Sequence, residues 1–270
     1  MEITVDDLGQ GIQRHTPTWG DRWYTWDQHE GLHMTSVTSI IDAGTPKPGL
    51  LYWATGLIGE KMVSEAETRP DYLIARLTDP DDDPVKWVKN IPYTRRDKAG
   101  KLGTEIHEIV ELLSKGEPYK HLVTAANSAY VEQFKKFWKD FNPTLKYAEA
   151  IVLNPDKLYA GTFDAIMEIN GKTVLVDYKT GKNVYAETTL QTAAYRFAEW
   201  MLVKDKVVPV PKVDHCMVLH LRPEKYELRE LAADKVAYKA FLDGFGGVHN
   251  WHTSLAKGTV GKAIKPKVKA

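Results

Sequence analysis

The stretch that most constrains the fold is GTFDAIMEINGKTVLVDYKTG, residues 161–181. Two runs rich in β-branched and aromatic residues flank the pair Asn170–Gly171. An Asn-Gly pair is typical of a two-residue type I′ turn, because both residues tolerate positive φ. The stretch therefore predicts a β-hairpin in which Ile169 pairs with Lys172, and in that register Asp164 lies opposite Asp177.

Two opposed carboxylates inside an apolar hairpin require a compensating cation. Directly opposed side chains have Cβ atoms about 4.5–5.5 Å apart, and like charges at that separation are destabilising. Lys179 follows Asp177 at the next position on the same strand face. Carboxylates from two strands suit Mg²⁺ or Mn²⁺. We therefore expect a divalent metal at Asp164 and Asp177 with Lys179 beside it; the alternative is that Asp177 and Lys179 form an ordinary surface ion pair.

The remaining segments indicate an α/β chain with helices on both sides of the hairpin in sequence. Apolar residues at helical spacing predict a helix that begins at Gly103 with Thr104 as its N-cap. Proline and clustered acids predict a loop over 78–84. The other expected helices are 50–67, 124–140, 185–203 and 234–252, and the other expected strands are 147–153, 213–221 and 225–231.

Four motifs occur in an order that resembles a known family. GTEIHEIVE, GTFDAI, VDYKTGK and QTAAY follow one another between Gly103 and Leu221, and together they resemble the PD-(D/E)XK nucleases of the RecB type. That branch includes stand-alone phage and CRISPR-associated exonucleases. The segment SVTSIIDAGTPKPGLLYW is similar to the N-terminal part of stand-alone phage members. The resemblance implies an α/β (α+β) fold with a restriction-endonuclease-like core, in which helices flank a central mixed β-sheet, and an N-terminal helical extension.

The resemblance also implies the roles of individual residues. Catalysis would rest on Lys179, which would orient the attacking water, together with Asp164, Asp177, Gln191 and Tyr195. The metal ligands would be His107, Asp164, Asp177 and the backbone carbonyl of Tyr178, with Glu149 and Glu111 as weaker candidates.

The implied activity is metal-dependent hydrolysis of DNA by an exonuclease that acts at DNA ends in recombination, repair or phage replication. The implied cofactor is Mg²⁺ or Mn²⁺. Two alternatives stay open: a structure- or site-specific endonuclease of the same fold, and a non-catalytic DNA-binding subunit. An annealing protein or a helicase would be a separate partner. The residues expected to contact phosphate, if they are not simply solvated, are Arg95, Arg96, Lys98, Lys101 and Lys182.

Composition narrows the expected mode of DNA binding, the possible cofactors and the location. The 36 basic and 36 acidic residues cancel, so DNA would have to be bound by local patches and not by overall charge. Cys216 is the one cysteine, which excludes an internal disulfide and the iron–sulfur cluster of many relatives. The sequence has no G-x-x-x-x-G-K-[ST] motif, so we expect no ATP-driven motor. No signal pattern or long apolar run is present, so we expect a cytoplasmic protein, in a bacterium or a phage-infected host, without a membrane partner.

The expected organisation has three parts. Residues 1–100 form an extension that packs on the core and is a candidate DNA-binding region. Residues 101–256 form the nuclease core with its closing helix, and 257–270 form a basic tail. Trp19, Trp23 and Trp26 in the extension are expected to pack a small subdomain; stacking on unpaired bases is the alternative.

Overall fold

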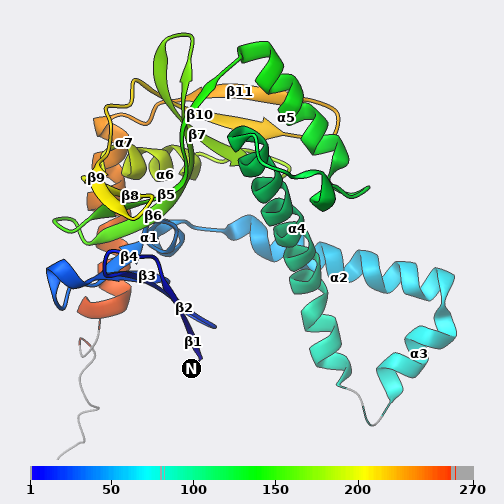
Figure 1. Cartoon of the computed structure of the whole chain (residues 1–270). Helices are drawn as coiled ribbons and strands as arrows, with labels where there is room; N and C mark the ends of the chain where they lie inside the picture. Colours follow the sequence, from blue (N-terminus) through cyan, green and yellow to red (C-terminus); the bar gives the residue numbers. More distant parts are fainter. Residues whose placement is uncertain (1, 80, 82, 257–258, 260–270) are drawn as a thin grey trace, which may run out of the picture.

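One open β-sheet runs through the computed structural model, which describes residues 2–79, 81, 83–256 and 259 (Figure 1). Within these residues the sheet has 11 strands, and the path β1-β2-β3-β4-β6-β5-β8-β9 is joined at β6 by β7, which pairs in turn with β10 and through it β11. Most neighbours are antiparallel, but β4–β6 and β7–β10 are parallel. The expected α+β class, with helices flanking a mixed sheet, is confirmed. The strands are β1 (Ile3–Asp7), β2 (Ile12–Pro17), β3 (Trp23–Trp26), β4 (Met34–Ser36), β5 (Thr144–Asn154), β6 (Tyr159–Ile169), β7 (Lys172–Lys179), β8 (Trp200–Val203), β9 (Lys206–Pro209), β10 (His215–Leu221) and β11 (Tyr226–Leu231).

Helices cover both faces of the central strands. On one face, Ile166 and Leu175 belong to an apolar cluster with Tyr195 of α6. On the other face, Val176 belongs to a cluster with Ile106 of α4, which also includes residues of α5. The helices are α1 (Val37–Gly44), α2 (Pro48–Thr68), α3 (Pro70–Thr78), α4 (Pro84–Lys115), α5 (Ser128–Phe141), α6 (Glu187–Arg196), α7 (Lys235–Lys239) and α8 (Gly246–Asn250), with short 3-10 helices η1 (Asp27–His29) and η2 (Lys120–Leu122) and π-helical turns η3 (Ala240–Phe245) and η4 (Trp251–Leu255).

The Asn-Gly hairpin has the predicted register. Asn170 and Gly171 have φ values of 50° and 72°, as a type I′ turn requires. Ile169 pairs with Lys172, and the ladder between β6 and β7 continues to Ala165 and Val176. It ends one step before Asp164 and Asp177, and the consequence of that break is described with the site.

The helix predicted to begin at Gly103 begins instead at Pro84, so the predicted start is wrong. Asp83 is the N-cap and accepts a hydrogen bond from the backbone N–H of Lys86. Gly100 and Gly103 lie inside this helix although each costs roughly 1 kcal/mol relative to alanine. Proline at the first helical position and the capping aspartate favour the earlier start. The predicted division of the chain at residues 100 and 101 would therefore cut α4.

Two other expectations also need correction. The helix predicted over 185–203 ends at Arg196, and Trp200–Val203 form β8 because they pair with β5. The N-terminal extension is not only helical, since β1 to β4 precede α1 and join the sheet through β6. Within that extension Trp26 is buried as expected of a packing residue, whereas Trp19 is 77% exposed. The expected basic tail lies, apart from residue 259, outside the described residues.

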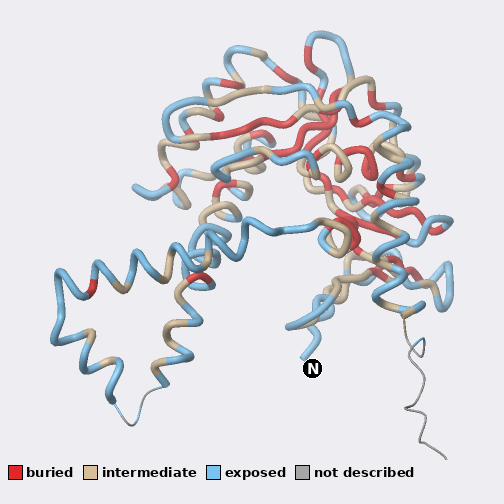
Figure 2. The backbone as a smooth tube through the Cα atoms, turned by 180° about the vertical axis from the view of Figure 1, so that it is seen from behind, coloured by how far each residue is buried: buried red, intermediate tan, exposed pale blue. Residues whose placement is uncertain are grey.

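The helices α2 and α3 and the first half of α4 form an arm that extends away from the sheet (Figures 1 and 2). Most arm residues are exposed, including Tyr52 and Tyr93. The second half of α4 returns to the sheet and packs Ile106 and Val110 into the core. Helix α4 thus runs from the arm into the core.

Gly161 offers a test of this packing. A Cβ atom at this position would lie 2.6 Å from Cε1 of Tyr195, which is closer than packed atoms tolerate. We expect Gly161→Ala to lower the free energy of unfolding by about 1–3 kcal/mol, as overpacking of a core does. Urea denaturation followed by circular dichroism measures the change.

The matched control for that experiment is Gly59→Ala in α2, where an added Cβ meets nothing within 4 Å. Because alanine has a higher helix propensity than glycine, this variant is expected to be as stable as the native chain or slightly more stable. Equal stability of Gly161→Ala and Gly59→Ala would contradict the described packing of Tyr195.

Candidate active site

Strand β6 changes partners in the middle of the sheet. Along one edge it pairs with β4 at Ala160, and it pairs with β7 only from Ala165 onward. Asp164 lies in the gap between these two partners. Its Oδ2 accepts a hydrogen bond of 2.5 Å from the backbone N–H of Tyr178. A side chain therefore binds β7 at the point where the β6–β7 ladder has ended.

Three potential metal ligands converge at this gap. Among the described residues, His107, Glu149 and Asp164 each offer a ligand atom, and these atoms lie within 4.8 Å of one another. Nδ1 of His107 lies 3.3 Å from Oδ1 of Asp164. The three residues come from α4, β5 and β6, so the group depends on the tertiary fold.

Glu149 is held in a backbone conformation that non-glycine residues rarely adopt. Its φ is +48° although it lies inside β5. The β5–β6 ladder pairs Ala148 with Ala165 and Ala150 with Phe163 but does not include Glu149 with Asp164. Strained residues of this kind often cluster at functional sites. Here the irregularity coincides with the convergence of Glu149, Asp164 and His107.

Burial and mutual repulsion change how this group holds protons. Burial, followed by the charges of Asp164 and Glu111, raises the pKa of Glu149 to about 7. Burial works against a charged His107, but the hydrogen bond to Asp164 and the charges of Asp164, Asp177 and Glu149 outweigh it. The pKa of His107 is therefore raised. Near neutral pH the group retains protons that a cation would displace.

Asp177 and Lys179 form a second group beside the first. Nζ of Lys179 lies 2.7 Å from Oδ2 of the buried Asp177 and forms an ion pair with it. Nζ also donates to Oε1 of Gln191 at 3.4 Å, and Nε2 of Gln191 donates to Oη of Tyr195 at 3.1 Å. Burial raises the pKa of Asp177 to about 6 despite the opposing charge of Lys179, and the charge of Asp164 adds to the rise.

Asp177 is not one of the three converging ligands, although the sequence predicts it beside Asp164. Asp177 shares its strand face with Leu175, which packs toward α6, whereas His107 approaches from α4 on the other face. Side-chain alternation in β6 is broken near Asp164, because Phe163 and Ile166 belong to the same cluster although they lie three positions apart. Asp164 therefore contacts His107, and Asp177 lies outside the three-residue group while remaining electrostatically coupled to it.

Two other expected ligands, the carbonyl of Tyr178 and the side chain of Glu111, do not belong to the three-residue group. The contact from Tyr178 to Asp164 is made by its N–H, and the expected role of its carbonyl stays a prediction. Glu111 lies one turn beyond His107 on α4 and forms an ion pair with Lys115. Glu149, one of the weaker candidates from the sequence, is one of the three residues of the group. Its only signal in the sequence is an acid in the strand before the hairpin.

The expected phosphate-binding residues are exposed but do not form one patch. At 100° per residue, Arg96 lies within about 20° of His107 around the axis of α4 and roughly 16 Å along it. Arg95 and Lys98 instead line a cleft of about 480 Å³ between α2 and α4. Lys101 and Lys182 are exposed. Among the expected phosphate-binding residues on α4, Arg96 is therefore the one best aligned with the three-residue group.

A small cleft beside Lys179 was not predicted from the sequence. It has a volume of about 210 Å³, and Lys179 and Gln191 line it together with Thr38 of α1 and the exposed Tyr185. Arg22 donates hydrogen bonds to Ser36 and Thr38 near the start of α1. The motifs that contain these residues do not show that they share a cleft, because the parallel β4–β6 pairing brings α1 to this position.

The donor set fits a hard divalent cation. Two carboxylates with one imidazole are compatible with Mn²⁺ and, through the carboxylates, with Mg²⁺. A cation would also relieve the repulsion that raises the pKa of Glu149. His107, Glu149 and Asp164 are therefore the residues that can hold it.

Comparison with known proteins gives little further information. No family model and no curated protein matches the chain. Among solved structures, one described as "Crystal structure of SSO0001" is 14% identical, covers 51% of this chain and 71% of its own, and has a TM-score of 0.26. A similarity this weak carries no argument. Within the part of the chain that the structure describes, no helix combines the length and apolar character needed to cross a membrane.

The three-residue group predicts which substitutions weaken metal binding. We expect His107→Ala, Glu149→Gln and Asp164→Asn each to lower the affinity for Mn²⁺ at least 10-fold, because each removes a ligand. Isothermal titration calorimetry on the purified chain measures the affinity. Glu111→Gln is the matched control, since Glu111 lies outside the group, and it should change the affinity less than about threefold. A larger loss for Glu111→Gln than for Glu149→Gln would contradict the assignment.

The raised pKa values predict the direction of the pH dependence. Below pH 7, Glu149 and His107 hold protons that compete with the cation, so the affinity for Mn²⁺ should rise from pH 6 to pH 8. Binding at pH 6.5 should release protons, which calorimetry detects as a dependence of the heat on the buffer's ionisation enthalpy. Glu149→Gln should release fewer protons. An unchanged proton count in that variant would contradict the role of Glu149.

Proposed function

We propose that this chain is a Mg²⁺- or Mn²⁺-dependent deoxyribonuclease that acts as an exonuclease at DNA ends. The observation that carries the proposal is the convergence of His107, Glu149 and Asp164 beside the network of Lys179. The sequence motifs that resemble RecB-type nucleases supply these residues, except that Glu149 replaces Asp177 within the group.

The order of elements supports the proposal. Helix α4 precedes three antiparallel strands, β5 to β7, and α6 then crosses to β10, which lies parallel to β7. This is the order that the resemblance implies, with the β8–β9 hairpin added between α6 and β10. A fold hosts many functions, so the proposal rests on the site and not on this order.

The residues of the group would hold the cation and, through it, the scissile phosphate. A divalent ion bound there neutralises the negative charge of the phosphodiester and acts as a Lewis acid. His107 and Glu149 bind in their deprotonated forms. The hydrogen bond from the N–H of Tyr178 keeps Oδ2 of Asp164 in place, which leaves Oδ1 on the side of His107.

Lys179 provides the positive charge on the other side of the reacting centre. Asp177 and Gln191 hold its ammonium group, and Tyr195 in turn holds Gln191. An ammonium group fixed in this way can orient the attacking water and stabilise the charge that develops on the phosphoryl oxygens. Its three donors allow it to contact a water while it keeps both protein partners.

The proposed substrate is DNA with free ends. Arg96 lies in line with His107 on the exposed arm, where it can contact phosphates beyond the scissile bond. We propose that the chain acts in the cytoplasm during recombination, repair or phage replication, with an annealing protein or a helicase as a separate partner.

Cleavage of end-labelled linear DNA tests the proposal. With Mg²⁺ or Mn²⁺ we expect release of labelled nucleotides, and with EDTA we expect none. Lys179→Ala and Asp177→Ala should lower kcat about 10²–10⁴-fold, the range of a lost acid–base or charge-stabilising group. Glu111→Gln, a matched removal of a neighbouring carboxylate, should retain most of the activity.

The same assay decides between the alternatives. Cleavage of closed circular DNA at a rate comparable to linear DNA would indicate an endonuclease. Tight DNA binding without cleavage under any metal condition would indicate a binding subunit. Full activity of Asp177→Ala and Lys179→Ala would show that this site does not carry out the hydrolysis.

A further inference from the structure

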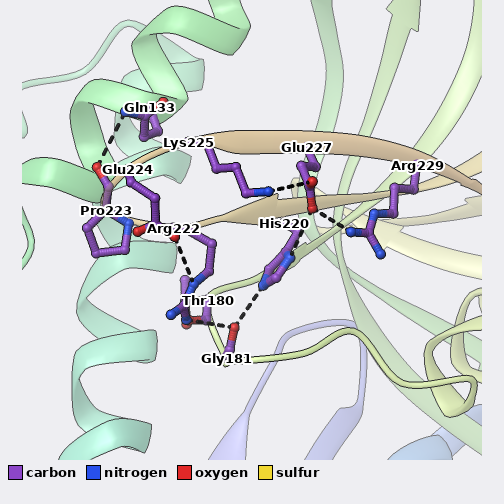
Figure 3. Close-up of polar contacts among 10 residues, drawn as sticks. All are labelled: Gln133, Thr180, Gly181, His220, Arg222, Pro223, Glu224, Lys225, Glu227 and Arg229. Atoms are coloured by element: carbon purple, nitrogen blue, oxygen red, sulfur yellow. Dashed lines mark hydrogen bonds and ion pairs between the residues drawn. The ribbon is translucent and has the colours of Figure 1, made fainter.

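The two residues that follow Lys179 are tied to the end of a neighbouring strand (Figure 3). Lys179 is the last residue of β7, and His220 is its partner in the parallel ladder with β10. Beyond Lys179, side chains of β10 and of the residue after its end bind the backbone of Thr180 and Gly181.

Two side chains make these contacts. Nη1 of Arg222 donates to the carbonyl oxygens of Thr180 at 3.3 Å and Gly181 at 3.0 Å. Nε2 of His220 donates to the same carbonyl of Gly181 at 2.8 Å, which means that Nε2 carries a proton. His220 is 6% exposed, so water does not readily replace this bond. We call Arg222 and His220 the loop clamp.

A second layer of charges holds the loop clamp from the side of β11. Oε2 of Glu227 lies 3.8 Å from Nδ1 of His220, and Glu227 also pairs with Lys225 at 2.8 Å and Arg229 at 2.5 Å. Hydrogen bonds from Lys225 and Arg229 lower the pKa of Glu227 to about 2, so it is charged at neutral pH. Figure 3 shows Glu227 above His220, with the side chains of Lys225 and Arg229 on either side of it.

Helix α4 lies against the same loop. A Cβ atom at Gly103 would meet Oγ1 of Thr180 at 3.3 Å, so the helix passes close to the loop one turn before His107. Thr180 therefore lies where the helix that carries His107 comes close to the end of β7.

We propose that Arg222 and His220 are positioning residues that fix Lys179 for catalysis, an inference that rests on the proposed nuclease function. Strand ends open more readily than strand centres, because they have fewer ladder hydrogen bonds. The loop clamp adds three hydrogen bonds directly after Lys179, to the carbonyls of Thr180 and Gly181. The lysine ammonium must reach both Asp177 and Gln191, and a displacement of about 1 Å at such a group can cost about 10²-fold in rate.

Kinetics of Arg222→Ala test the proposal. We expect kcat to fall at least 10-fold, while KM and the affinity for Mn²⁺ change less than about twofold, because His107, Glu149 and Asp164 are not touched by the substitution. Arg222→Lys, which keeps a donor, should recover part of the rate. Arg14→Ala is the matched control, since it removes an arginine of β2 that pairs with Asp6 and belongs to neither the loop clamp nor its second layer, and its kcat should stay within about twofold of wild type.

A double variant separates positioning from general destabilisation. If the loop clamp acts through Lys179, Arg222→Ala should cause no further loss in a Lys179→Ala chain. A further loss equal to that in the wild-type background would overturn the proposal. A parallel loss in Arg14→Ala would overturn it as well.

A spectroscopic readout keeps the proposal independent of the nuclease assay. In a chain labelled with ¹³C at the lysine ε carbons, the Lys179 resonance is assigned by its absence from Lys179→Arg. We expect Arg222→Ala to shift and broaden this resonance, and Arg222→Lys to restore it in part, even if the chain cleaves no DNA. An unmoved resonance in a folded Arg222→Ala chain would refute the positioning role. A shifted resonance without DNA cleavage by the wild type would count against the proposed function alone.

Discussion

The candidate site depends on the hydrogen bond between the Asp164 carboxylate and the backbone N–H of Tyr178. It forms where β6 has lost β4 as a partner and has not yet gained β7. An unpaired buried N–H costs free energy, so a side-chain acceptor at this point stabilises the break in the ladder. The same break frees the other carboxylate oxygen to face His107. The end of the ladder is thus the common cause of the irregular sheet and of the orientation of Asp164 toward His107.

A regular helix and an irregular strand bring potential ligands together at this break in the ladder. His107 is held by a regular element, a helix whose apolar side packs Ile106 and Val110 into the core. Glu149 is held by an irregular one, a strand residue with positive φ. Burial, followed by the charges of Asp164 and Glu111, raises the pKa of Glu149 to about 7, and a bound cation would offset this cost. Lys179 occupies a neighbouring network, so positive charge and prospective ligands stay separate.

Local sequence patterns predict the hairpin, but they do not reveal contacts between residues that lie far apart in the chain. The Asn170–Gly171 turn fixes a register that depends only on adjacent residues, and the structure confirms it to Ala165 and Val176. The sequence does not show that the ladder then ends, because the break depends on β4, which lies far away in the chain. For the same reason the sequence predicts Asp177 as a ligand beside Asp164 and gives only a weak signal for Glu149, whereas the three-residue group contains Glu149. The start of α4 differs from the prediction because Asp83, which lies in the predicted loop over 78–84, caps a helix that begins at Pro84.

The pairing of β10 with β7 also bears on how the protein is made. The ribosome delivers His107 first, then Glu149, Asp164 and Lys179, and Arg222 only after β10 has been synthesised. Until then β7 lacks its parallel neighbour, and the residues after Lys179 lack the bonds that hold them. Domains fold as units during synthesis, and contacts distant in sequence form late. A growing chain therefore has no complete site, and the proposed activity is withheld from nearby nucleic acid until translation has passed β10.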